Sequence, residues 1–146
     1  MTEVAFHFGA PDKIAYACRL LRKAVNTGAT IQVVCGPSCQ EQLDALLWSV
    51  SPTDFVTHCD RSASDLQREL SAVLLSGSPE TDQVNRQVLV NLGSAVPIGY
   101  DRYQRLIEVV GTDDSDRVLA RERWKHYTMA GYTIVRHDLA QSGASS

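Results

Sequence analysis

The sequence has no long hydrophobic run and no excess of basic charge. Charged residues interrupt every apolar stretch well before the ~18 consecutive apolar residues that a membrane-spanning helix needs. The first residues also lack the basic stretch and apolar core of a secretory signal, so we expect a cytoplasmic protein without membrane contact. With 14 basic and 17 acidic residues the net charge is −3, whereas direct nucleic-acid binding usually needs a net basic surface. Direct binding of DNA or RNA is therefore disfavoured.

The chain has four cysteines, and their spacing matches no strong motif. Without a secretion signal we expect Cys18, Cys35, Cys39 and Cys59 to be free thiols in a reducing compartment. Cys35 and Cys39 form C-x3-C, one residue longer than the thioredoxin-like C-x-x-C. Both could join Cys59 and His58 as zinc ligands, but this pattern is weakly specific, so we expect neither metal nor cofactor. A small α/β enzyme that uses Cys35 and Cys39 stays as the alternative to a binding function.

The glycine-rich loops of nucleotide-binding proteins are missing as well. The first expected strand ends at Gly9, where a dinucleotide fold would need several glycines, and Pro11 removes a backbone donor. Asp12 puts negative charge where a phosphate would lie. No P-loop motif occurs anywhere, and no set of Ser, His and Asp stands out. We interpret His126 and His137 as isolated residues in core or surface roles.

Along the chain, segments whose apolar residues recur with the period of a strand alternate with segments that have the period of a helix. Of its 146 residues 44% are hydrophobic, which is enough to bury roughly 68–70% of the unfolded surface in one core. The patterns predict strands at 3–8, 31–35, 55–58, 72–75, 88–92, 106–110 and 132–135. They predict helices at 14–25, from a Ser38–Glu41 capping box to Val50, and at 114–129. Asp12 is the expected N-cap of the first helix, and Gly131 is expected to end the last one. The strand at 72–75 is favoured over a helix at 66–74.

Strands that alternate with helices of these lengths indicate right-handed βαβ crossovers. The predicted fold class is α/β, a single-domain, Rossmann-like, mostly parallel sheet with helices on both faces. The domain is expected to cover residues 1–139. Residues 140–146 are expected to form a polar, disordered C-terminal tail.

The helix expected at 114–129 carries the strongest functional signal. One side holds three cations and a tryptophan, namely Arg117, Arg121, Trp124, Lys125 and Thr128. The other side, which we expect to pack on the sheet, holds Leu119, Ala120, Tyr127 and Ala130. The simpler interpretation is a solvated basic face with an edge tryptophan in the core. The functional interpretation is a receptor for a ligand that is both acidic and apolar.

Three segments resemble one known family. Residues 121–127, RERWKHY, followed by AGY at 130–132, look like the R-x-R-[YW]-x-x-Y…G signature of the bacterial DNA polymerase III chi subunit. Leu-Trp at 47–48 followed by DFVTH at 54–58 is similar to the family's LW…FVPH segment. VLVNL at 88–92 resembles its hydrophobic strand that ends in Asn-Leu. The order and spacing agree over nearly the whole chain, although 59–86 match poorly.

The resemblance implies an adaptor without catalytic activity in the clamp-loader assembly. Such an adaptor binds the acidic, phenylalanine-terminated tail of single-stranded DNA-binding protein. By position, Arg121 would take the terminal carboxylate, and Arg117 and Lys125 would take the upstream aspartates. The residues that would line the apolar pocket are Trp48, Val110 and Trp124.

The resemblance also implies a second surface, which contacts the psi subunit of the polymerase. Phe55 would carry over to that surface. Thr57 departs from the family because it replaces the proline of the FVPH segment.

Overall fold

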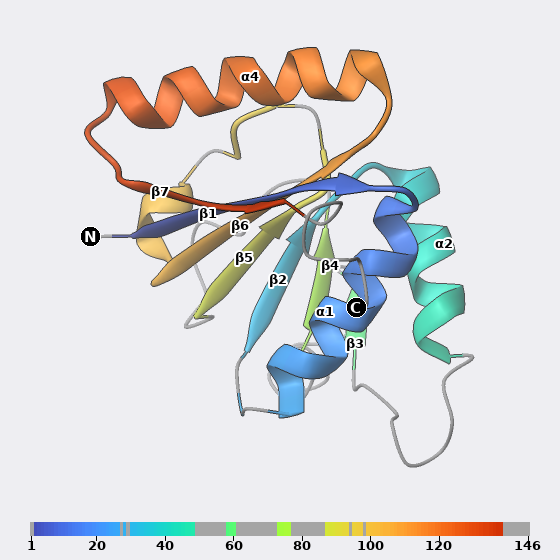
Figure 1. Ribbon diagram of the computed structural model, residues 1–146. Coiled ribbons are helices and arrows are strands. Elements are labelled where there is room, and N and C mark those ends of the chain that lie inside the picture. The colour runs from blue at the N-terminus through green and yellow to red at the C-terminus, as the bar shows by residue number, and fades with distance from the viewer. Residues whose placement is uncertain are drawn as a thin grey trace.

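The computed structural model describes residues 2–26, 28, 30–48, 58–60, 73–76, 87–93, 95–97 and 99–138. Within these residues, seven strands form one sheet in the order β3-β4-β2-β5-β6-β1-β7 (Figure 1). The strands are β1 (Glu3–Ala10), β2 (Ile31–Val34), β3 (His58–Asp60), β4 (Val73–Ser76), β5 (Val88–Asn91), β6 (Arg105–Gly111) and β7 (Ile134–Asp138). The helices are α1 (Lys13–Asn26), α2 (Pro37–Trp48), the short 3-10 helix η2 (Tyr100–Arg102) and α4 (Asp114–Met129). All six pairs of neighbouring strands are parallel, so the expected α/β class is confirmed.

The direction of each crossover explains why the helices cover two faces of the sheet. The chain passes through α1 from β1 to β2, and through α2 from β2 to β3, each time toward the β3 edge. It passes through α4 from β6 to β7, toward the opposite edge. Because such crossovers are right-handed, opposite directions put the helices on opposite faces. Accordingly, α4 lies on one face while α1 and α2 lie on the other (Figure 1).

Alternate residues of the central strands supply two separate cores. Val90 and Val109 pack with Leu21 on the face covered by α1 and α2. Their neighbours Leu89 and Val110 pack on the face covered by α4. Since both faces are covered, β5 and β6 need apolar residues at nearly every position, which is why they are continuous hydrophobic runs in the sequence.

Several predicted boundaries are confirmed. The Asp12 carboxylate accepts a hydrogen bond of 3.1 Å from the backbone N–H of Ala15, so it caps α1 as expected. The last helix covers 114–129 as predicted. Gly131 follows it with φ of 94°, a left-handed conformation that only glycine adopts readily. The favoured strand at 72–75 corresponds to β4.

Several predicted boundaries are wrong: β1 runs to Ala10 rather than ending at Phe8, and β3 continues to Asp60 rather than ending at His58. Ser38 is not an N-cap, because α2 already begins at Pro37, whose fixed φ suits a first helical position. The Ser38 hydroxyl instead accepts a hydrogen bond of 3.3 Å from the Gln42 side-chain amide. The last strand covers 134–138 rather than 132–135, because the N–H of Tyr132 still bonds the Tyr127 carbonyl in the turn after α4.

Some predictions concern residues outside the described ranges. They are the end of the second helix at Val50, the first part of the strand at 55–58, Phe55 itself, and the polar tail at 140–146. In the ranges that are described, no helix has the length and hydrophobicity required to cross a membrane.

Candidate functional site

The fold itself points first to the crevice between β1 and β6. These adjacent strands send their helices to opposite faces, and ligands of open α/β sheets bind at such a switch point. A pocket of about 510 Å³ lies there, between the β1–α1 and β6–α4 turns. The ammonium group of Lys13 crosses it, donating to the Leu92 carbonyl at 3.1 Å and pairing with Asp116 at 3.2 Å. Asp116 also accepts the backbone N–H of Gly111 at 2.8 Å. Two donors that could face a phosphate, the Lys13 ammonium and the Gly111 N–H, are therefore bonded to the chain's own carboxylate.

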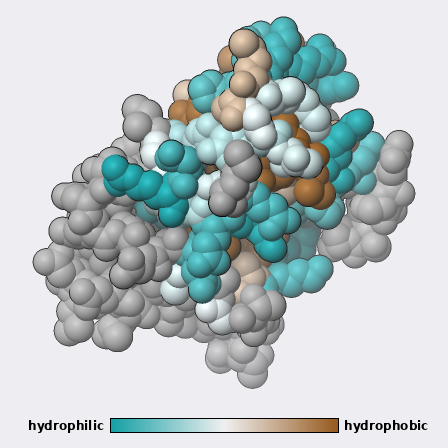
Figure 2. Space-filling model, turned by 90° about the vertical axis from the view of Figure 1, so that its left-hand side faces the viewer, coloured by the Kyte–Doolittle hydropathy of each residue, from teal (hydrophilic) through white to brown (hydrophobic). Residues whose placement is uncertain are grey.

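A second pocket, of about 370 Å³, lies between α4 and the edge of the sheet. Its described lining residues are Phe6 and Phe8 from β1, Val110 from β6, Arg117, Ala120, Arg121 and Trp124 from α4, and Arg136 from β7. The lining is aromatic and aliphatic, with three arginines around it. In the side view of Figure 2, the exposed hydrophobic residues lie mostly in the upper half of the molecule, among hydrophilic ones.

The side-chain periods of the strand β1 and the helix α4 bring these side chains together. Phe6 and Phe8 point to the α4 face because alternate residues of a strand share a face. On α4, the steps from Arg117 to Arg121 and then to Trp124 span four and three residues, so these side chains follow one another along the helix. Trp124 packs on Phe6 with ring centroids 5.0 Å apart and the rings tilted by 56°. This contact makes the floor of the pocket.

The arginines differ in their surroundings. Arg117 is 55% exposed and lies 3.9 Å from Asp114, which is too long and too solvated for a strong ion pair. Arg121 is exposed and has no carboxylate within ion-pair distance in the described part of the chain. The Arg136 guanidinium lies 5.3 Å from the Phe8 ring centroid and 5.9 Å from that of Trp124. The pocket therefore offers an apolar floor beside donors that suit a carboxylate.

A buried polar network lies between α4 and the strands β5 and β6. The Arg123 guanidinium donates to Glu108 at 2.9 Å, and the two side chains are 2% and 0% exposed. Tyr127 donates its hydroxyl to the same carboxylate at 2.5 Å, and the Asn91 amide donates at 3.0 Å. Burial raises the pKa of Glu108, while Arg123, Tyr127 and Asn91 act in the opposite direction. The network joins α4 to β6 and β5, and so fixes the helix that carries most of the pocket.

Sequence reasoning missed this network and assigned part of the helix wrongly. Leu119 was expected on the sheet but is 42% exposed, and Ala130, which follows the helix, is exposed too. The residues that face the sheet are Ala120, Arg123 and Tyr127, spaced three and four residues apart. The available signal was Glu108, a charge inside an otherwise apolar strand, because a buried carboxylate requires a partner.

The structure brings together four of the six residues predicted for tail binding. Val110, Arg117, Arg121 and Trp124 line the same pocket. Lys125 is exposed on α4 beside it and is not among the lining residues. Trp48 is the last residue of α2, which packs on the opposite face of the sheet, and its side chain lies outside the described part.

The three cysteines whose side chains are described lie on the α1 and α2 side. Cys18, Cys35 and Cys39 are free, with Cys35 buried directly after β2 and Cys39 half-buried in the first turn of α2. A hydrogen bond between the last two thiols, with burial, raises the pKa of Cys35, and the same bond lowers the pKa of Cys39. No group of three or more metal-binding side chains occurs among the described residues, which leave out the side chains of His58 and Cys59.

His137 is exposed, which fits a surface role, but it is not isolated as interpreted. It lies opposite His7 in the register of β1 and β7, with ring centroids 4.5 Å apart. On its other side His7 shares a hydrogen bond of 2.5 Å between its Nδ1 and the Tyr16 hydroxyl. Burial, then His137 and Arg105, lowers the pKa of His7 to about 4.

Together, the parallel sheet and the arginine-rimmed aromatic pocket define a small α/β protein suited to an acidic ligand with an aromatic group. The family model described as DNA polymerase III chi subunit, HolC, matches residues 1–135, so the chain belongs to this family. The match includes the signature at 121–132, which confirms the resemblance drawn from the residues. The chain is thus an accessory subunit for DNA replication.

Curated relatives agree with the family model. The DNA polymerase III subunit chi of Pseudomonas aeruginosa is 29% identical over 87% of each chain. The subunit chi of Haemophilus influenzae is 24% identical over 81% of each chain. That of Escherichia coli is 25% identical over 80% of this chain and 79% of its own. The similarity therefore covers most of every chain, despite low identity.

Proposed function

We propose that this chain is a non-catalytic adaptor of the DNA polymerase III clamp-loader assembly in the cytoplasm. In this role it binds the acidic C-terminal tail of single-stranded DNA-binding protein and links it to the holoenzyme. The observation that supports this most is the pocket of about 370 Å³ in which three arginines surround an aromatic floor. An acidic peptide that ends in phenylalanine has both the ring and the carboxylates that such a pocket recognises.

The pocket suggests a division of roles among its residues. The terminal ring of the peptide packs on Trp124 and Val110, which contributes ~1.5–3 kcal/mol of apolar transfer. Arg121 donates to the terminal carboxylate, and a charge-assisted hydrogen bond of this kind is worth ~1.5–3 kcal/mol. Arg117 and Lys125 meet the upstream aspartates as exposed ion pairs worth ~0.2–1 kcal/mol each. Arg121 should therefore matter most among these cations.

The charge of the whole chain supports an indirect route to DNA. A net charge of −3 opposes binding to phosphates, but it leaves a local site for an acidic tail intact. The protein then reaches DNA through the protein that coats it. We further propose, on the family resemblance, that a separate surface including Phe55 contacts the psi subunit. That Trp48 lines the tail pocket also rests on the family resemblance, and it stays a prediction.

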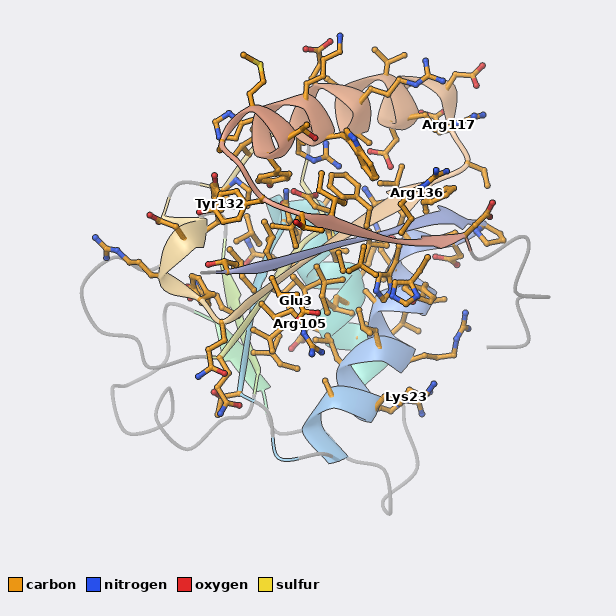
Figure 3. The ribbon with its side chains drawn as sticks, turned by 60° about the vertical axis from the view of Figure 1, so that its left-hand side comes forward. Glu3, Lys23, Arg105, Arg117, Tyr132 and Arg136 are labelled. Carbon is orange, nitrogen blue, oxygen red and sulfur yellow. The ribbon has the colours of Figure 1, made fainter. Side chains whose placement is uncertain are left out.

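Titration with a labelled acidic peptide that ends in phenylalanine tests the tail site. Arg121→Ala should weaken binding roughly 10- to 100-fold, because about 1.4 kcal/mol corresponds to one decade. Arg117→Ala or Lys125→Ala alone should cost only a few-fold. The matched control is Lys23→Ala, which removes an exposed cation from α1 on the opposite face and should leave affinity unchanged (Figure 3).

A truncated peptide provides the second arm of the test. Deleting the last phenylalanine removes the ring and displaces the terminal carboxylate, so the truncated peptide should barely bind. Added salt should weaken the intact peptide gradually, because it screens the aspartates more than the apolar anchor. Equal binding of both peptides, together with indifference to Arg121→Ala, would refute the site.

A further inference from the structure

One cation of the pocket does not come from α4. Arg136 belongs to β7, the strand at the edge of the sheet, and it lies opposite Phe6 in the register of β1 and β7. It shares the α4 face with Ile134, which packs in the core beneath the helix. In Figure 3, Arg117 comes from α4 and Arg136 from β7, and both side chains lie at the same end of the space between α4 and β7. The pocket therefore has arginines on two facing walls.

Two rings hold the Arg136 guanidinium at this wall. It lies 5.3 Å from the centroid of Phe8 and 5.9 Å from the centroid of Trp124, both distances within the range of cation–π contact. A planar guanidinium that stacks on rings keeps its N–H groups directed outward from its edge. No carboxylate of the described chain lies within ion-pair distance of it, whereas Arg117 faces Asp114. Its donors are thus available for an anion.

The position of these rings decides which part of a ligand meets Arg136. Phe8 and Trp124 are also lining residues of the pocket, so an aromatic ring bound there is a direct neighbour of Arg136. In a C-terminal phenylalanine, the carboxylate is attached to the carbon that bears the ring's methylene group. When the ring is on the floor, the carboxylate is therefore at the rim, between the α4 wall and the β7 wall.

We propose that Arg136 is a specificity-determining residue, which closes over the terminal ring and shares the terminal carboxylate with Arg121 from the opposite wall. This inference rests on the proposed function of the pocket. The two guanidinium groups make the site selective for an aromatic residue with a free C-terminal carboxylate. An acidic peptide with an internal or amidated aromatic residue lacks the group that both arginines address.

Two substitutions and two peptides test this assignment. Arg136→Met keeps the apolar stem but removes the charge, and it should weaken the free-acid peptide roughly 5- to 20-fold. Arg136→Lys keeps the charge but loses the planar fork, and it should recover only part of that loss. With the same peptide as a C-terminal amide, wild type and Arg136→Met should bind equally weakly. Lys23→Met is the matched control for loss of one exposed cation and should change neither peptide's affinity.

The outcomes separate this inference from the proposed function. If wild type binds the free-acid peptide and Arg121→Ala weakens it while Arg136→Met does not, only the role of Arg136 is overturned. Tighter binding by Arg136→Met would show that the arginine blocks the pocket instead of closing it. If Arg136→Met lost as much affinity for the amidated peptide as for the free-acid peptide, Arg136 would act only through general electrostatic attraction, which would overturn its role at the terminal carboxylate. Failure of wild type to bind the free-acid peptide would overturn both. Should Arg136→Met not fold, Arg136→Lys and the amidated peptide still decide between these results.

Discussion

Replacing Glu108 with glutamine is the sharpest test of what holds α4 on the sheet. The side chains of Arg123 and Glu108 are 2% and 0% exposed, and they meet at 2.9 Å. Glutamine keeps the shape but leaves the Arg123 charge without its carboxylate in a dry interior. Breaking a buried pair from one side costs ~3–5 kcal/mol, a large share of a typical total stability of ~5–15 kcal/mol. At about 2–4 °C per kcal/mol for a chain of this size, Glu108→Gln should lower Tm by about 6–20 °C.

The double substitution separates the cost of an unpaired charge from the worth of the pair. Glu108→Gln with Arg123→Met removes both charges, so it should recover most of the stability that Glu108→Gln alone loses. The control is the exposed pair of Arg105 with Glu3, 53% and 58% exposed at 3.6 Å, where Glu3→Gln should cost less than ~1 kcal/mol (Figure 3).

Urea unfolding, followed by circular dichroism, measures all of these free energies on one scale. The reasoning would be wrong if Glu108→Gln unfolded at the urea concentration of wild type. It would also be wrong if Glu3→Gln and Glu108→Gln cost the same, because burial would then make no difference.

Two further predictions concern other parts of the chain. Because the pKa of His7 falls from 6.5 to about 4 on folding, the unfolded chain binds more protons between these pH values. The free energy of unfolding should therefore fall as pH drops below 6.5, by on the order of 1 kcal/mol at pH 5 once the partial exposure of His7 is discounted. His7→Gln should reduce this pH dependence, which urea unfolding at pH 5 and pH 7 measures. Phe55→Ala should weaken binding to purified psi subunit while it leaves tail-peptide affinity within about two-fold. Loss of tail affinity in folded Phe55→Ala would show that the two surfaces are not separate.

The elements were predictable where burial imposes a single period. The strand at 106–110 and the helix at 114–129 were found because a strand covered on both faces and a helix covered on one leave distinct patterns. Arg123 was not recognised as buried, since a basic residue on a helix is usually solvated. Only its partner, Glu108, explains its burial, and the pairing of residues 15 positions apart depends on how α4 packs on β6.

The candidate site was half predictable for a similar reason. Arg117, Arg121 and Trp124 belong to one helix, so helical spacing alone puts them together. Phe6 and Arg136 are separated by nearly the whole chain, and they become neighbours only because β7 pairs with β1. Strand order is not contained in the hydrophobic pattern of one sequence. The contact between His7 and His137 was missed for the same reason.

The helix α4 is thus anchored by a buried arginine on its inner side and presents a second arginine on its outer side. Arg123 and Arg121 are two residues apart, which turns their side chains about 200° from each other around the helix. Arg123 meets Glu108 in the interior, while Arg121 reaches the pocket at the sheet edge. Because Glu108 pairs with the inner arginine, the position of α4 does not depend on a ligand, and the outer arginine keeps its donors for one. The pocket can therefore be preorganised at an open sheet edge without a buried charge left unpaired, which reduces the cost of ordering when a peptide binds.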